Sequence, residues 1–213
     1  MAIAKHFSLH PFFGLVDIIP AYSSIAFSFN LYAIHRQVNA GTTVFNWVQQ
    51  HVEAHLPNIS TIEDDTPEPI EIPVCYDPAL SNDLAAISLA TGLTQADIIS
   101  LHTAPNYYVY MLGFVPGFAY MGEVNTVLEL PRKNRPEKVN AGAVAIAGKQ
   151  TGIYPSHSFG GWHVLGHTPV KMFIMRNEHP CYLKAGEEVK FYPITLAEYL
   201  QMEPYRQPNT PDS

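Results

Sequence analysis

The distribution of glycine constrains the fold more than any other feature of this chain. Nine of the 13 glycines fall between Gly113 and Gly166, where short β-prone runs alternate with tight turns and helical periodicity is absent. Within this stretch and just before it, Ala143–Ala147 and Tyr107–Leu112 are typical of strands. Short strands, frequent turns and no long helix favour a closed or nearly closed β-barrel.

The first part of the chain predicts a strand and a helix. In Ser24–Asn30, apolar residues alternate with small or polar ones, which is typical of a half-buried strand. Thr43 is the expected N-cap of an amphipathic helix, in which valine or leucine recurs every four residues until Pro57. We therefore expect a small sheet covered by a helix.

A strand at Ile72–Tyr76 and two short helices are expected next. Ser81 or Asn82 is the predicted cap of the first helix, and Gly92 is placed to end it in a left-handed conformation. Thr94–Asp97 (TQAD) is a capping box that begins the second helix.

Charge is distributed unevenly and helps to place a domain boundary. Residues 1–80 hold eight acids against two bases, whereas residues 81–213 hold 11 acids against 10 bases. The run IEDDTPEPIEIP at residues 62–73 suits an exposed connection, so the boundary is expected near residues 65–77. We predict an α+β chain with a small N-terminal domain at 1–70, a barrel domain at 71–205 and a disordered tail at 206–213.

Composition excludes several classes of function. A net charge of −7 argues against a nucleic-acid partner, because phosphates require a basic surface. The two cysteines, Cys75 and Cys181, cannot form a disulfide framework. No run approaches the ~20 apolar residues that span a bilayer, and the N-terminus is a poor signal peptide. The expectation is a soluble cytoplasmic protein that binds neither membrane nor nucleic acid.

Self-contained catalytic motifs are missing from the sequence. Gly142–Gln150 resembles a phosphate-binding loop, but it has one intervening residue too many and a glutamine in place of the magnesium-binding serine or threonine. His157, His163 and His167 lie close together without any acid between residues 137 and 178, so we predict no metal site. There is no G-x-S-x-G nucleophile elbow, and neither cysteine lies in a catalytic signature.

Exposed aromatic and glycine-rich loops instead indicate a binding surface. Six aromatic residues crowd into fourteen positions, punctuated by glycine and proline: Tyr107, Tyr108, Tyr110, Phe114, Phe118 and Tyr120. Aromatic side chains in loops usually meet a ligand or a partner protein, and the sequence leaves both open. A basic island at residues 132–149 either receives a carboxylate or phosphate or is a solvated loop.

Several motifs in a fixed order resemble one known family. They are Tyr108–Gly122 (YVYMLGFVPGFAYMG), Leu130–Arg132, Ala141–Gly142, Ile146–Pro155 (IAGKQTGIYP), Gly160–Trp162, Gly166 and Thr168–Pro169. The match continues back through Ile72–Tyr76, Thr91–Leu93 and Leu101–His102, and more faintly to Val16–Ser24. The chain is thus similar to the family of the 5-oxoprolinase B subunit, which also contains the Kip-type sporulation kinase inhibitor and proteins described as allophanate hydrolase subunit 1.

The resemblance implies both a fold and a function. The family has a small N-terminal α/β sandwich domain followed by a cyclophilin-like β-barrel. Its members act with a C-type and an A-type partner protein of the 5-oxoprolinase to cleave 5-oxoproline to glutamate with ATP, which the partner complex binds or shares. The kinase-inhibitor members bind the dimerisation region of a sensor histidine kinase instead, and an allophanate or urea pathway role is a further alternative. Prolyl isomerase activity is a fourth and weaker alternative, because fold does not carry function.

The family context suggests roles for particular residues in the binding of a small-molecule substrate. Gln150, Thr151 and Tyr154 would form a hydrogen-bonding wall, and Trp162 and Phe118 apolar walls. The remaining candidates are His102 as a polar or acid/base group, Arg132 or Lys149 as the anion receptor, and His163.

Three departures from the family pattern stand out. Lys149 replaces an asparagine, and His163 and His167 replace a glutamine and an arginine. Relatives usually begin with an extra strand and helix, whereas about fifteen residues precede Val16 here. An incomplete N-terminal domain or a displaced start would explain that difference.

Overall fold

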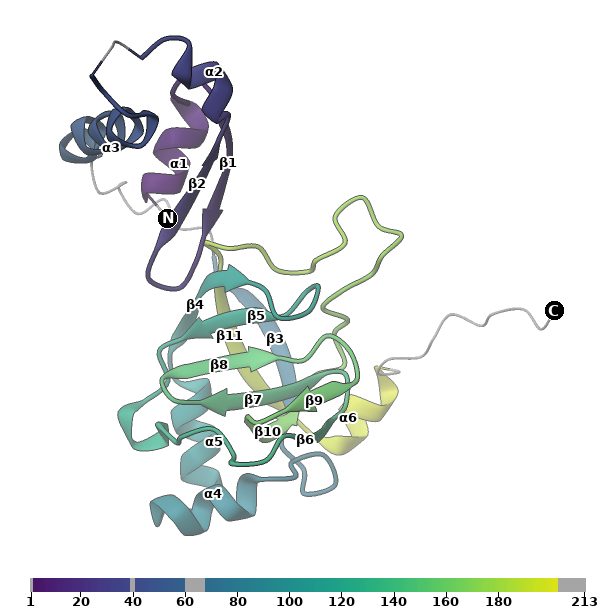
Figure 1. Cartoon of the computed structure of the whole chain (residues 1–213). Coiled ribbons are helices and arrows are strands. Elements are labelled where there is room, and N and C mark those ends of the chain that lie inside the picture. Colours follow the sequence, from purple (N-terminus) through teal and green to yellow (C-terminus); the bar gives the residue numbers. More distant parts are fainter. Residues whose placement is uncertain (1, 39–40, 60–67, 203–213) are drawn as a thin grey trace. The chain divides into compact units, whose positions relative to one another are not determined.

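The computed structural model describes residues 2–38, 41–59 and 68–202. The chain divides into two compact units, residues 1–66 and 67–213 (Figure 1). The predicted tail at 206–213 and residues 62–67 of the predicted acidic connection lie outside the described residues.

The N-terminal unit packs helices on a two-stranded sheet. Its elements are α1 (Ala2–Leu9), β1 (Leu15–Pro20), β2 (Ile25–Phe29), α2 (Leu31–His35), α3 (Val44–His55) and the 3-10 turn η1 (Leu56–Asn58). The two strands are antiparallel. Thr43 caps α3 as predicted, because its Oγ1 accepts a hydrogen bond of 3.1 Å from the Asn46 N–H. The core contains Phe7, Phe12, Ile34, Val44 and Val48.

The second unit is a closed barrel of seven strands in the order β10–β3–β11–β4–β5–β8–β7 (Figure 1). These strands are β3 (Ile70–Cys75), β4 (Asn106–Leu112), β5 (Ala119–Gly122), β7 (Ala143–Ala147), β8 (Gln150–Ile153), β10 (His163–His167) and β11 (Glu188–Ile194). The β11–β3 pair is parallel, and the other pairs of the barrel are antiparallel. Two further strands, β6 (Glu137–Val139) and β9 (Ser158–Gly160), pair with each other. The predicted α+β chain with a closed barrel is confirmed.

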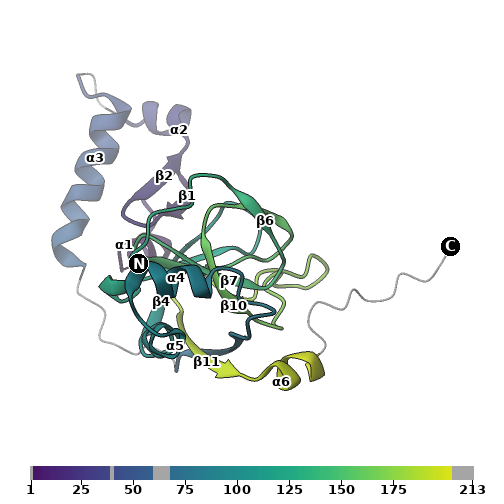
Figure 2. The ribbon, with the colours of Figure 1, turned by 90° about the horizontal axis from the view of Figure 1, so that it is seen from below.

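Helices α4 (Leu84–Thr91) and α5 (Gln95–Thr103) lie together at one end of the barrel (Figure 2). The remaining elements are the 3-10 turn η2 (Thr126–Leu128) and α6 (Leu196–Gln201). Gly92 ends α4 with a φ of 73°, and Thr94 and Asp97 form the predicted capping box of α5. The predicted cap of α4 is wrong: the N-cap is Asp83 rather than Ser81 or Asn82.

Among the described residues, no single helix is both long and apolar enough to cross a membrane. The α4–α5 pair meets the length and composition criteria only when both helices are taken together across their 98° bend.

Candidate functional site

The outer face of the barrel carries a hollow with a volume of about 190 Å³. One row of paired residues crosses the neighbouring strands β5, β8, β7 and β10 and therefore lies on one face of the barrel wall. Its members are Tyr120, Gly152, Ala145 and Val164. The row beside them, which includes Thr151, faces the barrel interior. The residues that line the hollow are Phe114, Phe118, Tyr120, Arg132, Pro136, Tyr154, Phe159, Gly160, Gly161 and Trp162.

Aromatic rings packed edge to face form the walls of this hollow. The Phe118 ring centroid lies 5.2 Å from that of Tyr154 and 5.4 Å from that of Trp162. All three side chains are buried. Edge-to-face pairs of this kind hold each ring in a defined orientation, so the walls are formed before a ligand arrives.

Two glycines make room for these rings. A Cβ atom at Gly152 would lie 2.9 Å from the Phe118 Cζ, and one at Gly160 would overlap the Tyr154 Oη. Real Cβ contacts are not that short, so any side chain at either position would displace an aromatic wall.

Arg132 and Tyr154 supply the polar chemistry of the hollow. The Arg132 guanidinium lies 5.9 Å from the centre of the Trp162 ring, and none of the described residues that line the hollow is acidic. Burial raises the pKa of the Tyr154 hydroxyl, although a hydrogen bond with the Trp162 backbone and the charge of Arg132 lower it in part. Tyr154 is therefore neutral and able to donate at physiological pH. The described lining thus combines aromatic walls, the Arg132 cation and the hydroxyls of Tyr120 and Tyr154.

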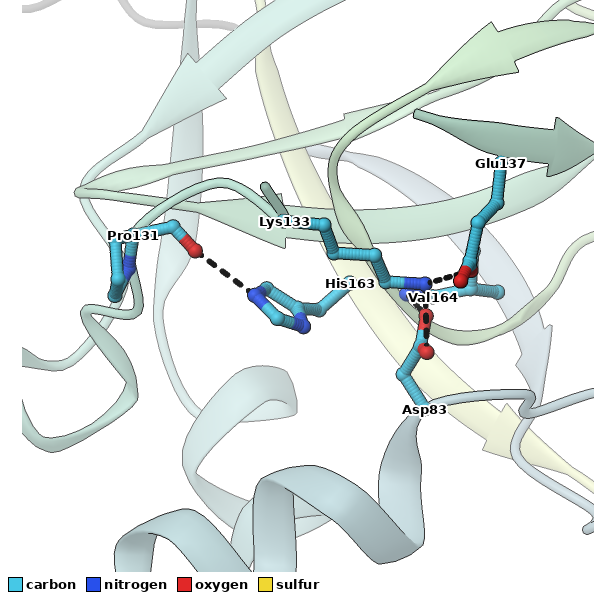
Figure 3. A network of polar contacts seen from close by, with 6 residues as sticks. All are labelled: Asp83, Pro131, Lys133, Glu137, His163 and Val164. Atoms are coloured by element: carbon cyan, nitrogen blue, oxygen red, sulfur yellow. Dashed lines mark hydrogen bonds and ion pairs between the residues drawn. The ribbon is translucent and has the colours of Figure 1, made fainter. Parts of the chain in front are cut away.

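A network around Lys133 anchors the loop that carries Arg132 (Figure 3). The Lys133 Nζ lies 2.7 Å from the Asp83 carboxylate and 2.6 Å from that of Glu137, and its backbone N–H donates to the Gly161 carbonyl. Asp83 also accepts from the Val164 N–H at 2.6 Å, which explains why its side chain does not cap α4. Burial lowers the pKa of Lys133, but hydrogen bonds to Asp83 and Glu137 outweigh this effect and raise it overall.

His102 and Thr151 lie in the barrel interior, away from the hollow. Thr151 Oγ1 donates to the Ala145 carbonyl, so it accepts from His102 Nε2–H at 3.0 Å. His102 Nδ1 then accepts from the Tyr76 hydroxyl at 2.8 Å. Burial lowers the pKa of His102 to about 3. Because His102 is fully buried and both its ring nitrogens are paired, its position favours a structural role over the predicted acid/base role.

The other predicted site residues lie outside the lining of the hollow. Gln150 is half-buried on the outer face of β8, opposite Ala147. Lys149 is exposed, with its Nζ 3.9 Å from the Glu123 carboxylate. His163 donates to the Pro131 carbonyl and lines a neighbouring groove between α4 and residues 130–134, which shares Arg132 with the hollow. The structure thus brings together four of the predicted residues: Phe118, Arg132, Tyr154 and Trp162.

The remaining histidines in this region also lie apart from the hollow. His157 is exposed, and the buried His167 bonds through Nδ1 to the Leu80 carbonyl. Among the described residues, no group of three or more His, Cys, Asp or Glu side chains is placed to hold a metal ion.

Sequence reasoning missed part of the lining. Phe114 and Tyr120 belong to the aromatic cluster in the sequence, but nothing there assigns them to the site. Pro136 and Phe159 carry no signal, because only the β6–β9 pairing brings their segments to the hollow.

Comparisons with known proteins identify the family. Residues 1–183 match the family described as carboxyltransferase domain, subdomain C and D. The 5-oxoprolinase B subunit of Bacillus subtilis (strain 168) is 36% identical over 200 residues, which cover 93% of this chain and 83% of that protein. The crystal structure of TTHA0988 has a TM-score of 0.73 at 34% identity over 91% of this chain, which spans 36% of that structure.

A more distant structure supports the architecture alone. The urea amidolyase of Kluyveromyces lactis has a TM-score of 0.68 at 16% identity, with 94% of this chain and 13% of that chain covered. It agrees with the predicted cyclophilin-like barrel. With the matches above, the chain belongs to the family of the 5-oxoprolinase B subunit, within the carboxyltransferase subdomain C and D proteins.

Proposed function

We propose that this chain is the B-type subunit of an ATP-dependent 5-oxoprolinase, which acts with A-type and C-type partner subunits. The main support is the hollow, whose described lining offers a small molecule aromatic walls, one arginine and no acid. The relatives are named as B subunits of 5-oxoprolinase, and the family resemblance supplies the reaction, the cleavage of 5-oxoproline to glutamate.

The chemistry of 5-oxoproline matches these groups. Its carboxylate would pair with Arg132, and its amide oxygen would accept from the neutral Tyr154 hydroxyl. Its ring methylenes would lie against the aromatic walls. A hollow of about 190 Å³ suits one small ring of this kind.

ATP is assigned to the partner complex in this proposal. Opening an unstrained lactam is unfavourable, and phosphorylation of the amide oxygen would turn it into a better leaving group. Gly142–Gln150, which resembles a phosphate loop in sequence, forms strand β7, a turn and the start of β8. This chain would therefore bind and orient the lactam, while its partners would supply the nucleotide.

Leave-one-out reconstitution tests the proposal. ATP-dependent glutamate release is measured with all three subunits and with each subunit omitted. We expect activity that requires this chain. A complete complex that assembles but releases no glutamate would contradict the proposal and favour the kinase-binding alternative or a related amide substrate.

Two variants then test the site. Tyr154→Phe should abolish turnover while the fold remains intact, and Gln150→Ala tests whether that residue also reaches the substrate. Tyr199→Phe is the matched control, since Tyr199 is also buried but lies on α6. Unchanged turnover in Tyr154→Phe would contradict the assignment of the hollow as the substrate site.

A further inference from the structure

Phe114 has an unusual backbone conformation at the rim of the hollow. Its φ is +66°, and it is the only residue other than glycine with a positive φ among the described residues. The Val115 N–H donates to the Gly113 carbonyl at 2.8 Å, so Phe114 is the central residue of a three-residue γ-turn. A bulky side chain is rare and strained in this region of φ/ψ space.

The surrounding turn imposes this conformation. The Gly113 N–H donates to the Phe118 carbonyl, and the Phe118 N–H donates to the Val115 carbonyl. On the other side, a Cβ at Gly117 would lie 2.8 Å from the Phe173 Cβ, so the turn is packed closely against that residue. The backbone at position 114 is therefore fixed, and glycine would suit it better.

The Phe114 side chain gains little from folding. Its ring is 60% exposed and touches the hollow edge-on, with centroid distances of 5.7 Å to Phe118 and 6.5 Å to Tyr154. An exposed ring on a strained backbone is a poor arrangement for stability. Strain of this kind is typical of positions that contact a ligand.

We propose that Phe114 closes the hollow over the apolar face of a small cyclic amide, a role that rests on the proposed function. The ring is presented at the rim before binding, so little side-chain ordering is required when the ligand enters. A bound ring would cover the exposed face of Phe114 and hold the amide toward Tyr154.

Opposite effects on stability and binding test this role. Phe114→Gly should raise the Tm of the chain because it removes the strain, whereas a structural phenylalanine would lower it. In the reconstituted complex the same variant should raise the KM for 5-oxoproline by about tenfold or more and change kcat less. Phe114→Asn, which also tolerates a positive φ, is the second variant in case glycine loosens the turn. Phe45→Ala is the control, since Phe45 is 68% exposed in the N-terminal unit.

A binding readout separates this inference from the proposed function. In a Trp47→Phe background, Trp162 emission is titrated with 5-oxoproline. A complex that binds 5-oxoproline but releases no glutamate contradicts the proposed function, and weaker binding in Phe114→Gly would still support the role of Phe114. A fall in Tm, or a KM unchanged in an active complex, overturns that role. No emission response with Phe114 in place overturns both.

Discussion

The two faces of strands β5, β8 and β7 use similar residues for different purposes. On the inner face, Thr151 is paired with Met121 on one side and with Ile146 on the other. The neighbouring pair, Tyr120 and Gly152, lies on the outer face. Inside, Tyr76, His102 and Thr151 form a chain of hydrogen bonds that ends on the Ala145 backbone carbonyl. Outside, the Arg132 guanidinium lies over the Trp162 ring in an open hollow. Polar residues therefore fix the barrel on one face and remain available to a ligand on the other.

The largest effect should come from breaking the inner network. His102→Leu removes the partner of the Tyr76 hydroxyl and the ring that stacks on Phe191. We expect a loss of about 3–5 kcal/mol in the free energy of unfolding, measured by urea denaturation. Arg132→Ala on the outer face should change the free energy of unfolding by less than about 0.5 kcal/mol. Equal losses in the two variants would contradict the division between the faces.

The inner network also shows where sequence reasoning stopped. Strand β7 and the caps at Thr43 and Thr94 could be predicted because local spacing and hydrogen-bonding residues determine them. His102 and Thr151 could not be placed inside, because 49 residues separate them and only barrel closure joins them.

The outer site could be predicted in part, because some of its residues belong to local sequence patterns. Phe118 belongs to the aromatic, glycine-rich cluster of the sequence, and the family resemblance suggests Trp162; both line the hollow. Lys149 and Gln150 group with Tyr154 in the sequence only because they are close along the chain. The β-turn before β8 directs Lys149 to solvent instead, where it faces Glu123.

A substitution at Gly160 should disturb the outer face alone. Gly160→Ala would place a methyl group against the Tyr154 hydroxyl, and the buried ring has little room to move. We expect about 1–3 kcal/mol of destabilisation from overpacking, together with loss of 5-oxoproline binding.

Gly161→Ala is the comparison variant, since Gly161 also lines the hollow but a Cβ there would meet the Lys133 carbonyl at 3.3 Å and no aromatic wall. It should retain most of the stability and binding. Similar behaviour of the two variants would show that Tyr154 adapts more easily than its burial implies.

A smaller effect should appear as the pH falls. His102 has a folded-state pKa of about 3, far below its ordinary value of 6.5, because burial disfavours the charged ring. The unfolded chain therefore takes up the proton first, so stability is full above pH 6.5 and is lost as the pH falls toward 3. The loss from this residue between pH 7.5 and 5.5 should be about 1.4 kcal/mol.

Urea denaturation of the wild type and of His102→Leu between pH 7.5 and 5.5 isolates this contribution. Burial also lowers the pKa of His167, and burial and the neighbouring His55 lower that of His51, so part of the pH dependence should remain. If the free energy of unfolding of His102→Leu falls with pH as steeply as that of the wild type, His102 takes up a proton inside the barrel.

The smallest effect is expected at Lys149, which tests how far the outer site extends. Its side chain is 57% exposed, and its pairing with Glu123 at 3.9 Å is a solvent-screened contact. Lys149→Ala should therefore change the free energy of unfolding by less than about 0.5 kcal/mol. Binding of 5-oxoproline should also be retained, whereas Arg132→Ala should weaken it at least about tenfold, because Arg132 is the cation that lines the hollow. If Lys149→Ala weakens binding as much as Arg132→Ala does, the ligand reaches beyond the hollow to the turn before β8.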